Sequence, residues 1–220
     1  MTAVTLAAAV PATDVLAVPT GPGSEGLVEL LGTLVDHDVR GLLVREKAKG
    51  DAGEIVLASA TDELRVLLLG VGDGTPGSWR KAGSALVRRA KSATSLALDL
   101  RGVSLSGDAL RGLTEGLVLG AYRFTQKPSA EPATLGAITL VVAKPQSLQA
   151  DLAKAVSVVR ATAFARDLVN TPPLEKSPVW LAARAKGLLK GLDVRIRDEG
   201  ELRAEGWGGV VAVGQGSSRP

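Results

Sequence analysis

Short apolar runs alternate with segments of helical spacing over the first two-thirds of the chain, and this alternation restricts the possible folds more than any other feature. The clearest run is Arg65 to Val71, "RVLLLGV". A helical pattern follows it from Ser78 to Ser92, with Ala82, Ala85 and Leu86 on one side. Runs without polar alternation are typical of strands that are buried on both faces of a sheet. The sequence therefore predicts an α/β protein, with helices on both faces of a parallel or mixed sheet.

The other elements of this region follow the same pattern. Further strands are predicted at residues 5–10, 15–18, 54–58, 95–100 and 137–143, and further helices at residues 26–35 and 108–124. Aromatic residues make up only 3% of the chain, so the core must be built from Val, Leu, Ile and Ala. These elements are expected to form an N-terminal α/β domain of residues 1–145, which folds independently.

A long helix is predicted next, over residues 147–169. Its apolar positions keep one face buried: Leu148, Leu152, Val156, Val159, Ala163, Phe164 and Leu168. Pro172 and Pro173 end it, because proline disfavours helical backbone in the residue before it. A second helix is expected to begin with Ser177 as its N-cap and Pro178 in its first position. Residues 146–170 are thus predicted to be an interdomain linker helix.

The last part of the chain, residues 171–220, contains three further short predicted elements. We expect a strand at residues 193–197, a short helix at residues 199–204 and a strand in "GVVAVG", Gly209 to Gly214. An apolar run without alternation needs neighbouring strands and covering helices. Residues 171–220 are therefore expected to be poorly ordered, or to pack on a partner, unless more polypeptide is present.

Composition excludes several classes of function. The chain has no cysteine, which rules out disulfide scaffolds and thiol nucleophiles. Its net charge is +3, and residues 1–145 hold equal numbers of basic and acidic side chains, so a nucleic-acid partner is not expected. The apolar N-terminus lacks the positive charge of a signal peptide, and no run is long enough to span a membrane. We expect a cytoplasmic protein.

No candidate for catalysis stands out among single residues. His37, the only histidine, lies between two aspartates and is interpreted as a surface residue. The glycine-rich turn Gly70 to Gly74, "GVGDG", lies between a strand and a helix, where backbone N–H groups could bind phosphate. It lacks the third glycine of a dinucleotide-binding loop and the lysine of a P-loop, so a sharp turn is favoured.

Two charged clusters have a structural and a functional interpretation. One face of the helix at residues 78–92 carries Lys81, Arg88 and Lys91, with Arg80 and Arg89 beside it; a phosphate-binding patch is possible, and a solvated face is favoured. Asp198, Glu199 and Glu201 lie at the start of a helix, where acidic side chains stabilise the helix dipole. They are not expected to bind metal.

The end of the chain resembles the leucyl aminopeptidase (cytosol aminopeptidase) family. The matching stretches are "ARDLVNTPP", Ala165 to Pro173, and "ELRAEGWGGVVAVGQGSSRP", Glu201 to Pro220. In the second stretch the family pattern includes Gly206, Gly208, Gly214, Gln215, Gly216 and Ser217. "LLLGVG" and "LTEGLVLGAYRF" resemble the more variable N-terminal domain of the family.

This resemblance implies a cytoplasmic metallo-exopeptidase that removes N-terminal residues from peptides. It also implies that residues 171–220 are the incomplete start of the α/β catalytic domain. In the family, two divalent metal ions (manganese, zinc or magnesium) activate a water molecule, and the subunits assemble as hexamers. The family's Val-Gly-Lys-Gly, Asp-Ser/Thr-Gly-Gly and Asn-Thr-Asp-Ala-Glu-Gly-Arg-Leu segments do not occur here. No catalytic, substrate-binding or metal-binding residue is therefore assigned, and the 220 residues alone are predicted to be inactive. The alternatives are a non-catalytic assembly, regulatory or DNA-binding module, or a short paralogue that only assembles with others.

Overall fold

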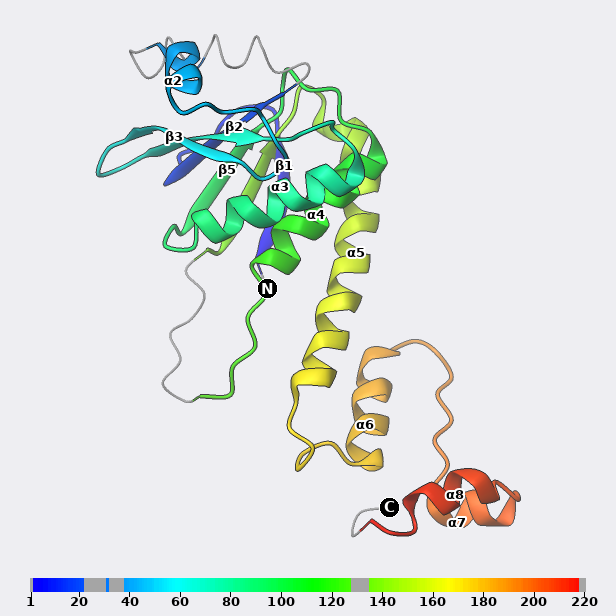
Figure 1. Ribbon diagram of the computed structural model, residues 1–220. Helices are drawn as coiled ribbons and strands as arrows, with labels where there is room; N and C mark the ends of the chain where they lie inside the picture. Colours follow the sequence, from blue (N-terminus) through cyan, green and yellow to red (C-terminus); the bar gives the residue numbers. More distant parts are fainter. Residues whose placement is uncertain (1, 22–30, 32–37, 128–134, 218–220) are drawn as a thin grey trace. The chain divides into compact units, whose positions relative to one another are not determined.

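The computed structural model describes residues 2–21, 31, 38–127 and 135–217 (Figure 1). The chain divides into two compact units, Met1–Phe164 and Ala165–Pro220. The division falls within helix α5, Pro145–Asn170, a continuous helix of 26 residues. The long helix predicted from the apolar spacing is therefore confirmed, whereas the predicted domain ranges stay a prediction.

The first unit is built on a six-stranded sheet with the order β1-β6-β5-β2-β4-β3. Its strands are β1 (Ala3–Ala7), β2 (Val15–Thr20), β3 (Ile55–Ala60), β4 (Arg65–Gly70), β5 (Ser95–Asp99) and β6 (Ala137–Val141). Only β3 is antiparallel to its neighbour, and the other pairs are parallel. Each predicted strand of this region is present, with ends that differ by up to a few residues, and the predicted mixed sheet is confirmed.

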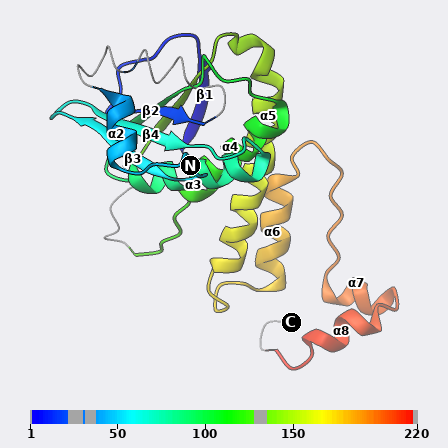
Figure 2. The same cartoon turned by 45° about the horizontal axis from the view of Figure 1, so that its top comes forward.

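Both faces of the sheet are buried, as the apolar runs predict. Val15 and Ala17 of β2 belong to the core on one face, together with α3 (Pro76–Arg89) and α4 (Gly107–Gly120). Leu16 and Val18 point to the other face, where Val39 of α2 (Val39–Arg45) covers them. Figures 1 and 2 show α3 and α4 side by side below the sheet and α2 on its opposite side. The short α2 was not predicted, and Asp38 caps it by accepting a hydrogen bond of 2.9 Å from the Gly41 amide.

Glycines allow α3 and α4 to pack at unusually close range. A Cβ atom on Gly112 would lie 2.1 Å from the carbonyl oxygen of Pro76, and one on Gly116 would lie 2.1 Å from that of Arg80. Gly120, one turn further along, approaches Ser84 in the same way, at 3.0 Å from its Cα atom. The spacing of four residues places the three glycines on one side of α4, because residues four apart share a helix face. Contacts between the two backbones thus determine how α4 lies on α3.

Helix α5 contributes to the core of the first unit. Leu152 is buried in the main apolar cluster, and Leu148 and Val156 pack against it. Val159 and Ala163 are buried as well, and Phe164 and Leu168 are half-buried. Every apolar position predicted to face inward on this helix is therefore at least half-buried.

The second unit consists of the end of α5 and three further helices. They are α6 (Pro178–Leu188), α7 (Glu199–Ala204) and α8 (Gly208–Gly214). Ser177 caps α6 by accepting a hydrogen bond of 3.1 Å from the Trp180 amide, and Pro178 occupies its first turn, as predicted. The predicted helix at residues 199–204 is also confirmed.

Two predictions for this unit are wrong. Residues 193–197 form no strand, and Gly209 to Gly214 lie in helix α8 instead of a strand. The reason is the same in both cases: a strand needs a neighbour for its backbone hydrogen bonds, and among the described residues of this unit no strand is present. A helix satisfies its hydrogen bonds locally, so the valine-rich run becomes helical although Val210 and Val213 remain 56% and 89% exposed.

Two sequence assignments lie outside the described residues: His37, and the helix predicted at residues 26–35, of which only Leu31 is described. Among the helices that are described, none combines the length and the apolar composition that a passage through a lipid bilayer requires.

Candidate functional site

The glycine-rich turn Gly70 to Gly74 connects β4 to α3, and hydrogen bonds to its own aspartate, Asp73, hold it in place. Gly72 and Gly74 have φ angles of 59° and 71°, which glycine adopts at little cost. The Asp73 carboxylate accepts hydrogen bonds from the Ser78 hydroxyl at 2.6 Å, the Thr75 hydroxyl at 2.9 Å and the Thr75 amide at 3.1 Å.

These bonds give the turn its chemical character. The hydrogen bond from Ser78, followed by those from Thr75, holds the pKa of Asp73 below its ordinary value, so the carboxylate stays ionised. Thr75 also caps α3 by accepting from the Ser78 amide at 3.3 Å. A phosphate at this helix start would meet a negative charge already in place. The geometry is that of a sharp turn, as favoured from the sequence.

Ligands of parallel α/β folds usually bind at the carboxyl ends of the strands. At the carboxyl end of β5, an aspartate is again held by hydrogen bonds from a nearby residue. Asp99 is buried and accepts from Arg101 through Nη2 at 2.6 Å, Nε at 3.0 Å and the backbone amide at 3.1 Å. This forked pair satisfies both partners.

The basic face of α3 is exposed, as favoured from the sequence. Its basic side chains have different interaction partners. Arg80 forms an ion pair of 2.5 Å with Glu115 of α4. Arg88 donates to the Ser84 hydroxyl within α3. Arg88 and Lys91 also line a pocket at the end of this helix, whereas Lys81 does not.

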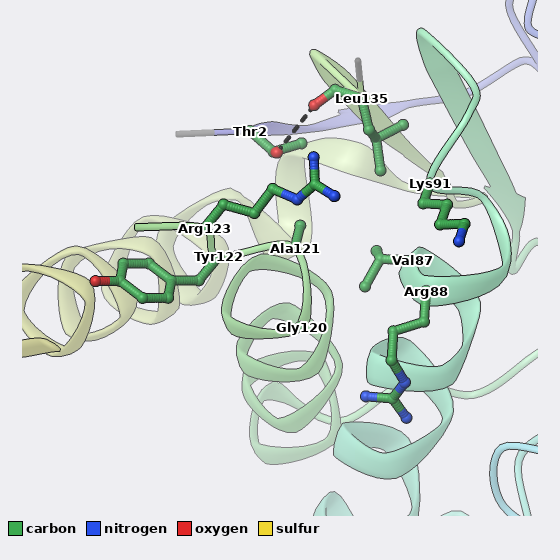
Figure 3. Close-up of a pocket in the computed structure, with 9 residues that line it drawn as sticks. All are labelled: Thr2, Val87, Arg88, Lys91, Gly120, Ala121, Tyr122, Arg123 and Leu135. Atoms are coloured by element: carbon green, nitrogen blue, oxygen red, sulfur yellow. Dashed lines mark hydrogen bonds between the residues drawn. The ribbon is translucent and has the colours of Figure 1, made fainter. Parts of the chain in front are cut away.

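That pocket brings together two parts of the chain that the sequence does not connect (Figure 3). Arg123 lies just beyond the end of α4 and joins Arg88 and Lys91 around a cavity of about 300 Å³. The other lining residues are Thr2, Val87, Gly120, Ala121, Tyr122 and Leu135. Figure 3 shows Arg123 on one side of the apolar floor and Lys91 on the other. Sequence reasoning missed Arg123, since only the packing of α4 on α3 places it here.

The acidic cluster of the second unit has a structural role. Asp198 accepts from the Glu201 amide at 2.9 Å, and Glu201 accepts in return from the Asp198 amide at 2.9 Å. This reciprocal pair is a capping box, which satisfies two amides at the start of α7. Glu199 pairs with Arg203 one turn later, at 2.6 Å.

The residues that the structure describes form no site for the metal ions expected from the family that the sequence resembles. Among them, no three His, Cys, Asp or Glu side chains lie close enough to hold a metal ion.

Comparison with protein families identifies both units. The model described as "Cytosol aminopeptidase family, N-terminal domain" matches residues 22–129, and the one described as "Cytosol aminopeptidase family, catalytic domain" matches residues 163–220. Together they cover about three quarters of the chain, in the order in which the sequence motifs occur.

Curated relatives agree with the family models. A probable cytosol aminopeptidase of Rhodococcus opacus (strain B4) is 37% identical over 227 residues, which cover 94% of this chain and 44% of that protein. One of Mycobacterium ulcerans (strain Agy99) is 41% identical over 166 residues, covering 70% of this chain and 31% of that protein. The chain thus spans less than half the length of the curated relatives it matches.

Solved structures share the fold. The bottromycin maturation enzyme BotP in complex with Mn is 29% identical, with a TM-score of 0.73 over 94% of this chain and 43% of that one. A mutant of tomato leucine aminopeptidase, 19% identical, gives a TM-score of 0.77 over 93% of this chain and 46% of that one. The two family models and the curated relatives show that the chain belongs to the cytosol aminopeptidase family and matches its N-terminal domain and part of its catalytic domain.

Proposed function

We propose that this chain is the N-terminal part of a metal-dependent aminopeptidase, which removes N-terminal residues from peptides. The observation that carries the proposal is the match of residues 163–220 to the catalytic-domain model, after the match of residues 22–129 to the N-terminal domain. A chain that served only assembly or regulation would not be expected to contain part of a catalytic domain. The non-catalytic and DNA-binding alternatives are therefore not favoured.

The exposed apolar side chains of the second unit support this role. Most of the large apolar residues that the described structure leaves exposed lie here, including Leu174 at 79%, Val179 at 74% and Val213 at 89%. Fully burying one such side chain contributes about 1.5–3 kcal/mol. In the complete enzyme we expect further polypeptide of the catalytic domain to cover them, and residues 163–220 to form one side of that domain.

The metal ions belong to the proposal as well. We propose that two divalent ions act in the complete protein, with manganese, zinc or magnesium as candidates. The solved BotP complex with Mn is a guide to their chemistry. Such ions polarise the scissile carbonyl and activate water. The ligands would come from segments with the family motifs, which the 220 residues lack. A cytoplasmic hexamer is the assembly expected for the complete enzyme.

The test compares the 220-residue chain with the complete protein that this proposal implies. Both are purified and assayed with leucine p-nitroanilide in the presence of Mn²⁺. The longer protein should release nitroaniline, lose activity with EDTA and regain it with Mn²⁺, and sediment as a hexamer. The 220 residues should be inactive under all conditions. Activity of the short chain, or a longer product that never hydrolyses the substrate, would show the assignment to be wrong.

A further inference from the structure

The pocket between the ends of α3 and α4 combines positive charge with an apolar floor (Figure 3). Arg88, Lys91 and Arg123 supply the charge, and none of the nine described residues that line the cavity is acidic. We propose that this pocket binds a small phosphorylated molecule, whose phosphate lies between Arg123 and Lys91. The site belongs to the N-terminal domain and does not depend on the peptidase activity.

The electrostatic balance of the pocket favours an anion. Helix α3 ends at the cap residue Ala90, and α4 ends at the cap residue Ala121, so both carbonyl ends face this region. Each helix end carries roughly half a negative charge. The side chains of Lys91 and Arg123 line the cavity and oppose these partial charges, and a ligand with more than one negative charge can interact with both of them.

The donor groups favour phosphate among the possible anions. The guanidinium of Arg123 offers planar, forked N–H donors that match two phosphate oxygens, and the Lys91 ammonium acts as a compact charge from the opposite side. Arg88 donates to the Ser84 hydroxyl at the rim, so its charge lies beside the cavity and not inside it. Figure 3 shows this arrangement, in which Arg123 and Lys91 flank the floor and Arg88 points away from it.

The size and floor of the pocket restrict the rest of the ligand. A volume of about 300 Å³ is at the lower limit for small-molecule sites, which excludes large cofactors. Val87, Ala121 and Leu135 form an apolar floor, and the Thr2 hydroxyl closes one wall by donating to the Leu135 carbonyl at 3.0 Å. A phosphate with a small apolar or planar body fits both halves of the cavity.

The close packing of the helices builds the site. A Cβ atom on Gly120 would lie 2.8 Å from a methyl group of Val87, so only glycine lets α4 end directly against α3. Tyr122 and Arg123 leave the helix at this point. Without that contact Arg123 would not reach the turn after α3 that carries Lys91.

The experiment titrates the 220-residue chain with pyrophosphate and with phenyl phosphate at constant ionic strength, using calorimetry and thermal unfolding. We expect saturable binding of one ligand per chain and a rise in the unfolding temperature. Arg123→Gln and Lys91→Gln should each weaken binding at least tenfold. Arg89→Gln removes the same charge from the last turn of α3 but lies outside the pocket lining, and it should bind as the parent chain does.

Each other outcome counts against the proposal. An absence of saturable binding would reject the site, and equal losses in Arg89→Gln and Arg123→Gln would show general attraction to a basic surface. Citrate binding as tightly as pyrophosphate would reject the preference for phosphate, and tighter binding of duplex DNA would point to a nucleic-acid surface instead. The unfolding temperatures of the variants without ligand verify that each one folds. If Arg123→Gln lowers that temperature while leaving binding intact, the arginine only stabilises a helix end.

Discussion

Asp14 joins two neighbouring strands of the sheet at their amino ends. Its carboxylate accepts four hydrogen bonds, from the Thr94 amide at 2.6 Å, the Thr94 hydroxyl at 2.8 Å, the Ser95 hydroxyl at 3.2 Å and the Ser95 amide at 3.3 Å. The bond from the Thr94 amide contributes most to lowering the pKa of Asp14 below its ordinary value of 3.8. One side chain thus aligns the starts of β2 and β5, a role that no local pattern in the sequence indicates.

The pKa of Asp14 leads to a prediction about stability. Because the folded-state pKa is lower than the unfolded one, ionised Asp14 stabilises the fold above pH 3.8, and this contribution disappears as the pH falls through the folded-state pKa. Asp14→Asn should therefore lower the urea midpoint at pH 7, and the difference from the parent should shrink by pH 3. Circular dichroism during urea unfolding measures both. Asp62→Asn, in the exposed turn before β4, should have little effect at either pH; a difference for Asp14→Asn that does not depend on pH would contradict the prediction.

At the scale of elements, the glycines of α4 lead to a second prediction. Gly116→Ala would place a Cβ atom 2.1 Å from the Arg80 carbonyl oxygen, so α3 and α4 must move apart. We expect a loss of about 1–3 kcal/mol in the free energy of unfolding, typical of an overpacked core. Gly187→Ala in α6 is the matched control, since nothing lies within 4 Å of its added Cβ atom. That variant should be neutral or more stable by up to about 1 kcal/mol, and equal effects of the two changes would show that helix packing is not the cause.

The valine-rich helix α8 leads to a third prediction. It has only seven residues, and of its valines only Val211 is buried. Short isolated helices are marginal in water. In the 220-residue chain, backbone amides of Val210 to Gly214 should exchange with deuterium within the shortest labelling times, whereas those of Leu67 to Leu69 in β4 should be protected. In the complete enzyme proposed above the valine-rich amides should become protected, and strong protection in the 220-residue monomer would contradict this interpretation.

Elements were predictable to different degrees, for physical reasons. The strands of the first unit could be located because each apolar run finds neighbours within the described chain, as Leu67 of β4 does beside Ala17 of β2. Helix α6 could be located from Ser177 and Pro178, since a cap acts over a few residues. Val210 to Val213 were misassigned because a buried strand and a short helix share the same apolar composition, and only the presence of neighbours decides between them.

At the scale of the whole chain, helix α5 leads to a fourth prediction. Leu152 is 3% exposed within the core of the first unit, so a fragment of residues 1–145 would leave that surface bare. Burial of a leucine contributes about 1.5–3 kcal/mol, and Leu148 and Val156 add to this. We expect residues 1–164 to unfold in urea at the same midpoint as the first unit of the intact chain, and residues 1–145 at a clearly lower one. Equal midpoints for the two fragments would mean that α5 is dispensable for this core.

The sequence by itself determined the α/β class, the positions of the strands of the first unit, the long helix and its proline stop, because these depend on the spacing of residues that are close along the chain. It also carried the family resemblance, through the motifs around Ala165 to Pro173 and Glu201 to Pro220. Tertiary structure alone decided that Arg123 and Lys91 line the same pocket, that Asp14 binds Thr94, and that the closing valines are helical. The physical reason is that these features depend on which distant segments come close to one another in the fold. Glycines such as Gly116 permit a close approach of two helices, but the sequence alone does not show which helix will be the partner.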